Sequence, residues 1–221
     1  MRWWIVGNGS SLLDTPLDRL IGENTIACNQ IHRMYDKTDW RPSVYLKFER
    51  ATEIKHRWKE HVKLHLDMGI PCYLWETFKD GYPEGHPNYL DIPDGVGEYP
   101  NAIWTPDCEH KFYRPWNTRG STGWHLPEIC NGFCSVAIGM QIAVLRGATE
   151  IYLVGCDLGF TKPPHHFVDN YIPGGDYNAN TDKLVRMSHE VAERDCPIPI
   201  YNATIGGELE VHKRVNLEDI L

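Results

Sequence analysis

Short apolar runs, each followed by turn-forming residues, recur through the first third of the chain. A strand that is covered on both faces reads as a continuous apolar segment, so runs of this kind that are rich in β-branched and aromatic residues indicate buried strands. We therefore expect four buried strands before residue 76. Their ranges are 2–6 (RWWIV), 24–28 (NTIAC), 44–48 (VYLKF) and 71–75 (PCYLW).

The second half of the chain alternates helical patterns with further apolar runs. Residues 133–146 are apolar with small side chains and stop at Gly147, which predicts a buried helix. Strands that alternate with helices imply right-handed crossovers and a mostly parallel sheet. The predicted fold class is therefore α/β, a Rossmann-like sheet with helices on both faces. The other expected elements are helices over 10–20 (capped by Ser10 or Ser11), 52–68 and 180–195, and strands over 150–154 and 198–201.

Two stretches lack a regular period. Residues 76–128 are rich in Pro, Gly, Trp, Tyr and His, and residues 158–182 follow the strand expected at 150–154. Long irregular segments are uncommon in compact domains and are often functional, and the aromatic content of 76–128 argues against disorder. With no internal repeat and no linker, we expect one domain over 1–221, with an irregular insertion at 76–128 and a lid-like segment at 158–182.

Composition and charge argue against several classes of partner. The 221 residues are 42% hydrophobic, enough for a core, and the net charge of -8 argues against a general nucleic-acid binder, which needs a basic face. No segment approaches the ~20 apolar residues of a membrane span, and the short apolar start does not resemble a signal peptide. Seven scattered cysteines, an odd number, indicate reduced thiols and a cytoplasmic protein.

Glycine and asparagine follow the first two expected strands. Gly7, Asn8 and Gly9 follow the first, and Asn29 follows the second. In open α/β sheets ligands bind outside the carboxyl ends of strands, where free amides beside glycine can hold a phosphate. An asparagine amide, with both donor and acceptor atoms, suits a base or a sugar. Leu12 breaks the full G-x-G-x-x-G spacing, so plain turns remain an alternative.

Two later positions are candidates for the same ligand. Asn131-Gly132 opens the helix predicted at 133–146, where the amides and the helix dipole favour an anion. Asp157 directly follows the strand at 150–154, and a carboxylate there is a common partner of a ribose or a metal. Each position also has a plainer role, as a helix cap for Asn131 and a turn cap for Asp157.

Histidines in the lid-like segment are candidates for proton transfer. His165 and His166 titrate near neutral pH when unperturbed and so suit general acid or base chemistry. Adjacent histidines in a strand point apart, which makes them poor joint metal ligands, and solvated loop histidines are the alternative. We predict no zinc site, because the residues of suitable type lack a C-x-x-C pair. These residues are Cys108, His110, Cys130 and Cys134.

Three of these motifs, in this order, resemble a known family. The motifs are IVGNGSSLLDTPLDRL at 5–20, ACNQI at 27–31 and NGFCSVAIGMQIAVLRGATEIYLVGCDLGF at 131–160. They resemble the bacterial lipooligosaccharide sialyltransferases and their relatives, the motility accessory factors and the pterin diphosphokinase-like proteins. The resemblance covers the first ~30 residues and 131–160. It is weaker in the last third of the chain and absent from the middle third.

The resemblance implies a Rossmann-like glycosyltransferase that uses a CMP-sugar without a metal or other cofactor, in a homo-oligomer. The implied partners are a nucleotide-sugar donor and a glycan or other hydroxyl acceptor. Carried over by position, one set of residues would contact the donor and Asp157 would lie beside its ribose or base. The donor-contacting set is Gly7, Asn8, Gly9, Ser10, Asn29, Asn131 and Gly132.

The sequence departs from the family pattern around the catalytic groups. Gly159 stands where the family has a tyrosine that stabilises the leaving phosphate, and His165 stands at a second tyrosine position. The family's base histidine precedes an N-T-D stretch, which is present here at 180–182, but the expected position falls near Tyr177. His165, His166 or His189 would have to take the place of that histidine. Of these we expect His166 by preference to serve as the base, with His165 donating to the phosphate.

Three functions remain open from the sequence. The first is a glycosyltransferase that uses a nucleotide-activated sugar, such as CMP-sialic acid or a related CMP-nonulosonate, in surface glycan (lipopolysaccharide) synthesis. The second is an Mg²⁺-dependent, diphosphokinase-like phosphoryl transferase with Asp157 and Asp169 as metal ligands. The third is a nucleotide-binding module without catalysis.

Overall fold

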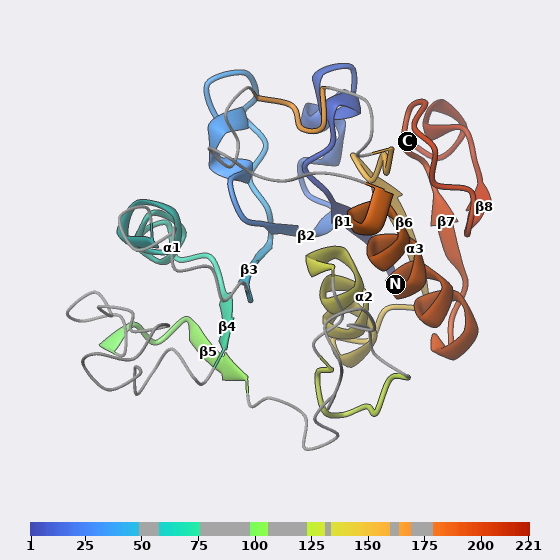
Figure 1. Cartoon of the computed structure of the whole chain (residues 1–221). Helices are drawn as coiled ribbons and strands as arrows, with labels where there is room; N and C mark the ends of the chain where they lie inside the picture. Colours follow the sequence, from blue (N-terminus) through green and yellow to red (C-terminus); the bar gives the residue numbers. More distant parts are fainter. Residues whose placement is uncertain (49–57, 76–97, 106–122, 131–133, 160–163, 169–178) are drawn as a thin grey trace.

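A single parallel sheet forms the centre of the molecule (Figure 1). The computed structural model describes residues 1–48, 58–75, 98–105, 123–130, 134–159, 164–168 and 179–221. Within these ranges the strand order is β5-β4-β3-β2-β1-β6-β7-β8, and every neighbouring pair is parallel, which confirms the predicted α/β class. The strands are β1 (Arg2–Val6), β2 (Asn24–Cys28), β3 (Val44–Lys47), β4 (Cys72–Trp75), β5 (Ala102–Thr105), β6 (Glu150–Val154), β7 (Ile200–Asn202) and β8 (Lys213–Arg214).

The strand order reverses between β1 and β6. From β1 the chain steps outward through β2 to β5, and then returns to β6 on the other side of β1. Val6, the last residue of β1, is level with Ala27 of β2 and Val154 of β6. Connections on the two sides of such a reversal diverge, and ligands bind at this topological switch point in open α/β sheets. The carboxyl ends of β1, β2 and β6 are therefore where a site is expected.

Helices cover both faces of the sheet, as predicted. Tyr45 and Leu46 are consecutive in β3 and so point to opposite faces. His65 of α1 stacks on Tyr45, with ring centroids 3.8 Å apart, whereas Gly139 of α2 lies on the Leu46 side. Helix α3 packs beside α2. The helices are α1 (Trp58–Asp67), α2 (Ser135–Leu145) and α3 (Ala179–Asp195).

The central strands and α2 form the core. Trp4, Ile5, Ile26 and Leu46 are buried, and α2 is apolar on nearly all sides, as expected of a helix that is covered all round. Gly139 lets α2 approach the sheet, since a Cβ there would lie only 3.2 Å from Ile5 Cγ2. Each fully buried aliphatic side chain contributes about 1.5–3 kcal/mol relative to an exposed one.

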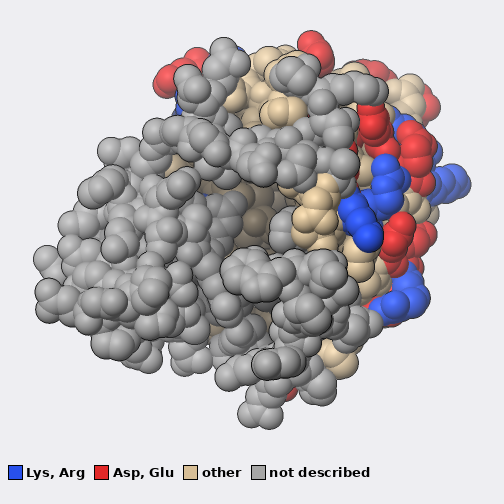
Figure 2. Space-filling model, viewed as in Figure 1, with Lys and Arg blue, Asp and Glu red and all other residues tan. Residues whose placement is uncertain are grey.

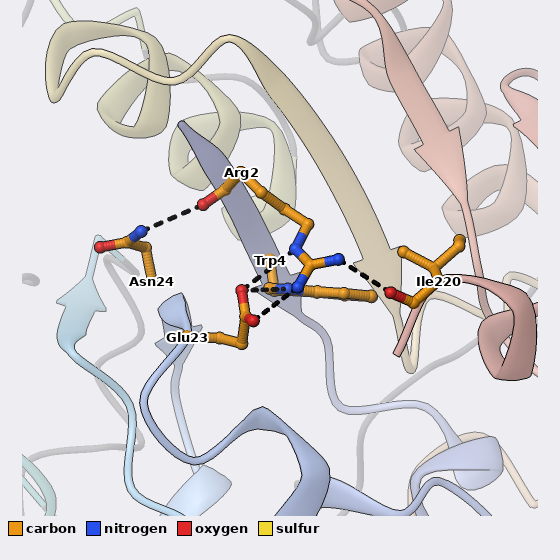
Figure 3. Close-up of polar contacts among 5 residues, drawn as sticks. All are labelled: Arg2, Trp4, Glu23, Asn24 and Ile220. Atoms are coloured by element: carbon orange, nitrogen blue, oxygen red, sulfur yellow. Dashed lines mark hydrogen bonds and ion pairs between the residues drawn. The ribbon is translucent and has the colours of Figure 1, made fainter.

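Polar contacts around Arg2 join the C-terminal turn to β1 (Figure 3). The guanidinium pairs with Glu23 through Nε–Oε2 (3.1 Å) and Nη2–Oε1 (2.5 Å), and Nη1 donates to the carbonyl oxygen of Ile220 (2.9 Å). Trp4 Nε1 also donates to Glu23 (3.3 Å), and Asn24 Nδ2 donates to the Arg2 carbonyl (3.2 Å). The hydrogen bond from Arg2 lowers the pKa of Glu23, so the pair is ionised at neutral pH.

The prediction of one helix over 10–20 is wrong. Two short 3-10 turns occupy this stretch, because Pro16 has no amide hydrogen to donate and disfavours the helical conformation of the preceding Thr15. The short turns of the described chain are η1 (Ser10–Leu13), η2 (Leu17–Leu20), η3 (Ile31–Met34) and η7 (Leu217–Asp219).

Two strands lie where none was expected. Strand β5 lies inside the stretch 76–128 predicted to be irregular, and β8 follows the strand predicted to be the last. Helix α1 is described from Trp58, so the first residues of the helix predicted at 52–68 lie outside the described chain. Helix α3 begins at Ala179, so the end of the lid-like segment is helical.

Charges of both signs lie interspersed on the described surface around α3, β7 and β8 (Figure 2). No disulfide joins the cysteines in the described ranges. Among the described helices, none combines the length and the apolar character that crossing a bilayer requires.

Candidate functional site

The turns that follow β1 and β6 pack directly against each other at the switch point. Gly7 N donates to the Val154 carbonyl and Gly9 N donates to the Gly155 carbonyl, each at 2.8 Å. A Cβ on Gly7 would lie 2.3 Å from the Gly155 oxygen, so this approach requires glycine. The expectation that the amides of Gly7 and Gly9 are free for a phosphate is therefore wrong, because both already bond to carbonyls on the β6 side.

Asp157 holds the β1 turn in place. Its Oδ2 accepts from Ser11 N (2.8 Å) and from Ser10 Oγ (3.1 Å), and its Oδ1 accepts from the Ser11 hydroxyl. Gly9 makes room for this carboxylate, since a Cβ there would lie 2.4 Å from Asp157 Cγ. Of the two roles left open, the structure shows capping, although of the turn after β1 rather than the next one. The contacts of Asp157 with a ribose and of Ser10 with a donor stay predictions.

Asn8 connects the β1 turn to the end of β2. Its Nδ2 donates to the Cys28 carbonyl (3.2 Å) and lies 3.3 Å from Cys28 Sγ. The residue is only 9% exposed, and within the described chain its Oδ1 accepts no hydrogen bond. A buried amide oxygen without a donor costs about 1–3 kcal/mol, so a water or a ligand is expected to donate to it.

Asn29 is held at the end of β2 by two residues of β3. It has φ 55°, in the left-handed region that asparagine tolerates better than most residues. Its carbonyl accepts from the Tyr45 hydroxyl (2.8 Å) and its Oδ1 accepts from Lys47 Nζ (3.1 Å). Lys47 is 1% exposed. Sequence reasoning missed Lys47, because an apolar run predicts a buried strand but not which residue a lysine within it contacts.

His166 lies against the β1 turn. Its Nδ1 is 3.0 Å from the Asn8 carbonyl oxygen, and Phe167 N donates to the same oxygen (3.3 Å). A carbonyl can only accept, so Nδ1 of His166 donates this hydrogen bond. Buried Phe167 anchors this segment. The structure thus brings His166 against Asn8, and His165, beside it, is half-buried.

The C-terminal segment packs on the end of β6. Glu208 N donates to the Asp157 carbonyl (2.6 Å), and Glu208 lies against Gly159, where a Cβ would be 3.3 Å from its Cδ. Gly159 has φ +80°, which disfavours a tyrosine there. Thr204 Oγ1 accepts from Cys156 N (3.1 Å), which ties this segment to the site. The family's tyrosine position is thus covered by another part of the chain.

Thiols beneath the turn do not offer a nucleophile. Burial raises the pKa of the Cys156 thiol well above its usual value, so it is protonated at neutral pH. In the described ranges, no group of three or more His, Cys, Asp or Glu side chains is placed to hold a metal ion. Asn131, Gly132 and the metal-ligand candidate Asp169 lie outside the described residues, as do Cys108 and His110.

The fold and the position of the site define a Rossmann-like protein with its candidate site at the switch point. No protein-family model matches the sequence, and no curated protein matches it. The fold is similar to that of the MAf glycosyltransferase from Magnetospirillum magneticum AMB-1, with a TM-score of 0.56 and 17% identity. The similarity covers 97% of this chain, which spans 33% of that one. It confirms the motif-based resemblance at the level of the fold.

A second solved structure is more distant. It is that of the sialyltransferase CST-II in complex with a trisaccharide acceptor and CMP, at a TM-score of 0.46 and 15% identity. That similarity covers 98% of this chain and 89% of the other. At 17% identity, the likeness to the MAf glycosyltransferase speaks for the fold alone.

Proposed function

We propose that the chain is a glycosyltransferase that uses a nucleotide-activated sugar. One observation carries the proposal: at the switch point of a parallel sheet, where such folds bind nucleotides, Asn8 bonds to Cys28, the residue before Asn29, and His166 lies against Asn8. The amides provide donor and acceptor atoms for a sugar or phosphate, and the histidine provides a proton acceptor. The fold shared with the MAf glycosyltransferase supports the class.

The proposed reaction needs a base and a site for the leaving nucleotide. An acceptor hydroxyl attacks the anomeric carbon as the bond from that carbon to the phosphate oxygen breaks, and the nucleotide leaves with the bonding electrons. Nε2 of His166 takes the hydroxyl proton, while the bond from Nδ1 to the Asn8 carbonyl holds the ring in place. The asparagine amides bind the donor. A donated hydrogen bond from His165 to the phosphate is part of the proposal.

Within this class we propose a CMP-nonulosonate, such as CMP-sialic acid, as the donor and a hydroxyl of a surface glycan as the acceptor. The support is the order of the motifs at 5–20, 27–31 and 131–160. We further propose a metal-independent reaction in the cytoplasm, by a homo-oligomer. Each of these finer statements depends on the motif resemblance.

Thermal shift against a nucleotide panel tests the proposal. CMP, CDP, UDP, GDP and ATP are each added with Mg²⁺ and with EDTA. A ligand at 100 times its Kd stabilises the folded state by about 2.7 kcal/mol, which raises Tm measurably. We expect CMP or CDP to stabilise the protein equally in both buffers. Stabilisation by ATP that requires Mg²⁺ would favour a phosphoryl transferase instead, and no shift with any nucleotide would contradict the proposal.

Consumption of the donor then separates an enzyme from a binding module. CMP-sialic acid is incubated with the protein and a panel of glycan acceptors, and released CMP is measured. We expect acceptor-dependent release that persists in EDTA. A nucleotide that binds but is not consumed with any acceptor would leave a binding module as the function.

A further inference from the structure

The two asparagines of the site present opposite edges of their amides. Asn8 uses its nitrogen, which donates to the Cys28 carbonyl, and its oxygen has no donor within the described chain. Asn29 uses its oxygen, which accepts from Lys47 Nζ at 3.1 Å, and no described residue accepts from its nitrogen. A ligand therefore meets an acceptor at Asn8 and a donor at Asn29.

Lys47 determines which edge Asn29 presents. An ammonium group can only donate, so it selects the amide oxygen and turns the N–H₂ edge away from itself. Tyr45 and Lys47 are two residues apart and project from the same face of β3, from which both bond to Asn29. The backbone and the side chain of Asn29 are thus fixed separately.

The charge of Lys47 acts in a protected environment. The side chain is 1% exposed, so its field is screened far less than that of a surface lysine. Burial lowers the pKa of the neighbouring His32 to about 4, and the charges of Arg33 and Lys47 add to this shift. Arg33 also donates to Gln30, the residue after Asn29, at 3.2 Å. Two basic side chains, Arg33 and Lys47, thus lie near the end of β2.

We propose that Lys47 is a positioning residue, which holds the Asn29 amide so that its N–H₂ edge and the buried positive charge together bind the anionic group of the donor. This inference rests on the proposed function and adds to it a residue and the chemistry of one subsite. The anionic group is a phosphate or a sugar carboxylate, since both offer oxygen acceptors to an amide and a cation. The oxygen of Asn8 then accepts from a hydroxyl of the same ligand.

Two variants and a matched control test the proposal. Lys47→Met removes the charge and the donor at similar length. Asn29→Asp removes the N–H₂ edge but places a carboxylate against the ammonium, so the fold should keep its stability while anion binding falls. Lys63→Met removes an exposed lysine that pairs with Asp67 on α1. Calorimetry measures Kd for cytidine, CMP, CMP-sialic acid and pyrophosphate.

We expect Lys47→Met to weaken CMP about tenfold and to leave cytidine unchanged, whereas Lys63→Met changes neither. A loss with CMP assigns the subsite to the phosphate. A loss that appears only with CMP-sialic acid assigns it to the carboxylate. A role confined to folding would weaken cytidine and CMP by the same factor, and that result would overturn the proposal.

The pyrophosphate measurement separates the two proposals. If the unmodified protein binds no nucleoside or nucleotide, the proposed function fails. Pyrophosphate binding that is weakened tenfold by Lys47→Met or Asn29→Asp would still establish the anion subsite. The role given to Lys47 would be contradicted if both variants bound every anionic ligand with the affinity of the unmodified protein. It would also be contradicted if none of the three proteins bound an anion. If Lys47→Met does not fold, Asn29→Asp decides.

Discussion

The Asp157 carboxylate determines which residue can stand at position 9. A Cβ at Gly9 would lie 2.4 Å from Asp157 Cγ, a distance that real Cβ contacts do not reach. Gly9→Ala must therefore displace the carboxylate that bonds to Ser10 and Ser11. We expect the free energy of unfolding to fall by about 1–3 kcal/mol, measured by urea denaturation followed by tryptophan fluorescence.

A double-mutant cycle with Asp157 checks that cause. Asp157→Ala removes the caps of the turn and should destabilise the protein by itself. It also removes the atoms that clash with residue 9, so the two changes together should cost less than the sum of the single changes. Additive costs would mean that the clash at Gly9 is relieved in another way.

His166 provides the residue-scale prediction for catalysis. If Nε2 takes the acceptor proton, His166→Ala should lower kcat by about 10²–10⁴-fold. The Kd of the donor should change little, because donor binding is assigned to Asn8 and Asn29. Released CMP measures turnover, and calorimetry with CMP measures binding. Unchanged turnover in the purified variant would remove His166 from the mechanism.

Much of the candidate site could be predicted residue by residue from where strands end. Asn8, Asn29 and Asp157 follow predicted strands, and the parallel sheet brings those ends to one edge. The bonds of the Gly7 and Gly9 amides could not be foreseen, since their acceptors lie on β6, far along the chain. Likewise, the partners of Lys47 depend on the fold.

At the scale of elements, the local sequence pattern predicts a strand correctly where most of the strand is buried. Strands 2–6, 24–28 and 150–154 were predicted with the bounds that the structure shows, because each is a continuous apolar run closed by a turn residue. Strand β5 (Ala102–Thr105) is embedded in a stretch rich in proline and glycine, and β8 (Lys213–Arg214) carries no apolar residue. Both are recognisable only by their pairing with β4 and β7.

Helix α3 is joined to the segment before β8 by two buried histidines and a half-exposed glutamate. His189 Nδ1 lies 3.0 Å from His212 Nε2, and His212 Nδ1 lies 2.6 Å from Glu193. Burial lowers the pKa of His189 to about 3 and also lowers that of His212, despite the bond to Glu193. Both rings are therefore neutral at pH 7, and the contact between His212 and Glu193 is a hydrogen bond rather than an ion pair.

This chain of groups predicts acid sensitivity. In the folded state the pKa of each histidine lies below its unfolded value of about 6.5, so the unfolded state binds more protons. The stabilisation from both histidines is full above pH 6.5 and is lost as the pH falls; for His189 the loss continues toward pH 3, by about 1.4 kcal/mol per pH unit. Urea denaturation between pH 7.5 and 4.5 measures the slope.

The comparison variant is His189→Gln, which cannot titrate. His32 and His65, whose pKa values burial also lowers to about 4, contribute equally in both proteins. The slope should therefore be shallower in the variant by about one proton. The same slope in both proteins would mean that His189 is not kept neutral by the fold.

At the scale of the whole molecule, one sheet connects parts of the chain that are far apart in sequence. Strand β1 pairs with β6, and Asp157 bonds to Ser11 across that pairing. The site therefore exists only when β1, β2 and β6 are assembled. Alternation of strands and helices predicts a parallel sheet, but not which strands are neighbours, because pairing is decided by packing between distant segments.

Arg2 tests whether the C-terminal turn belongs to this assembly. Arg2 and Glu23 are 29% and 26% exposed, and Arg2 also donates to the Ile220 carbonyl. Arg2→Met leaves the part-buried Glu23 carboxylate without its cation, although Trp4 still donates to it, and removes the donor to the Ile220 carbonyl, so we expect a loss of about 1–3 kcal/mol. Lys63→Met, which breaks a pair that is 54% and 47% exposed, should cost much less, because solvent screens an exposed ion pair.

The Arg2→Met variant also tests whether the C-terminal turn and the sheet unfold in one cooperative transition. If the turn and the sheet unfold together, Arg2→Met lowers the urea midpoints of tryptophan fluorescence and far-UV circular dichroism equally. Arg2 of β1 donates to the C-terminal turn, and β1 lies between the two halves of the sheet. A change at Arg2 should therefore lower the midpoint that each of the two methods measures. Midpoints that separate in the variant would show that the C-terminal turn unfolds on its own.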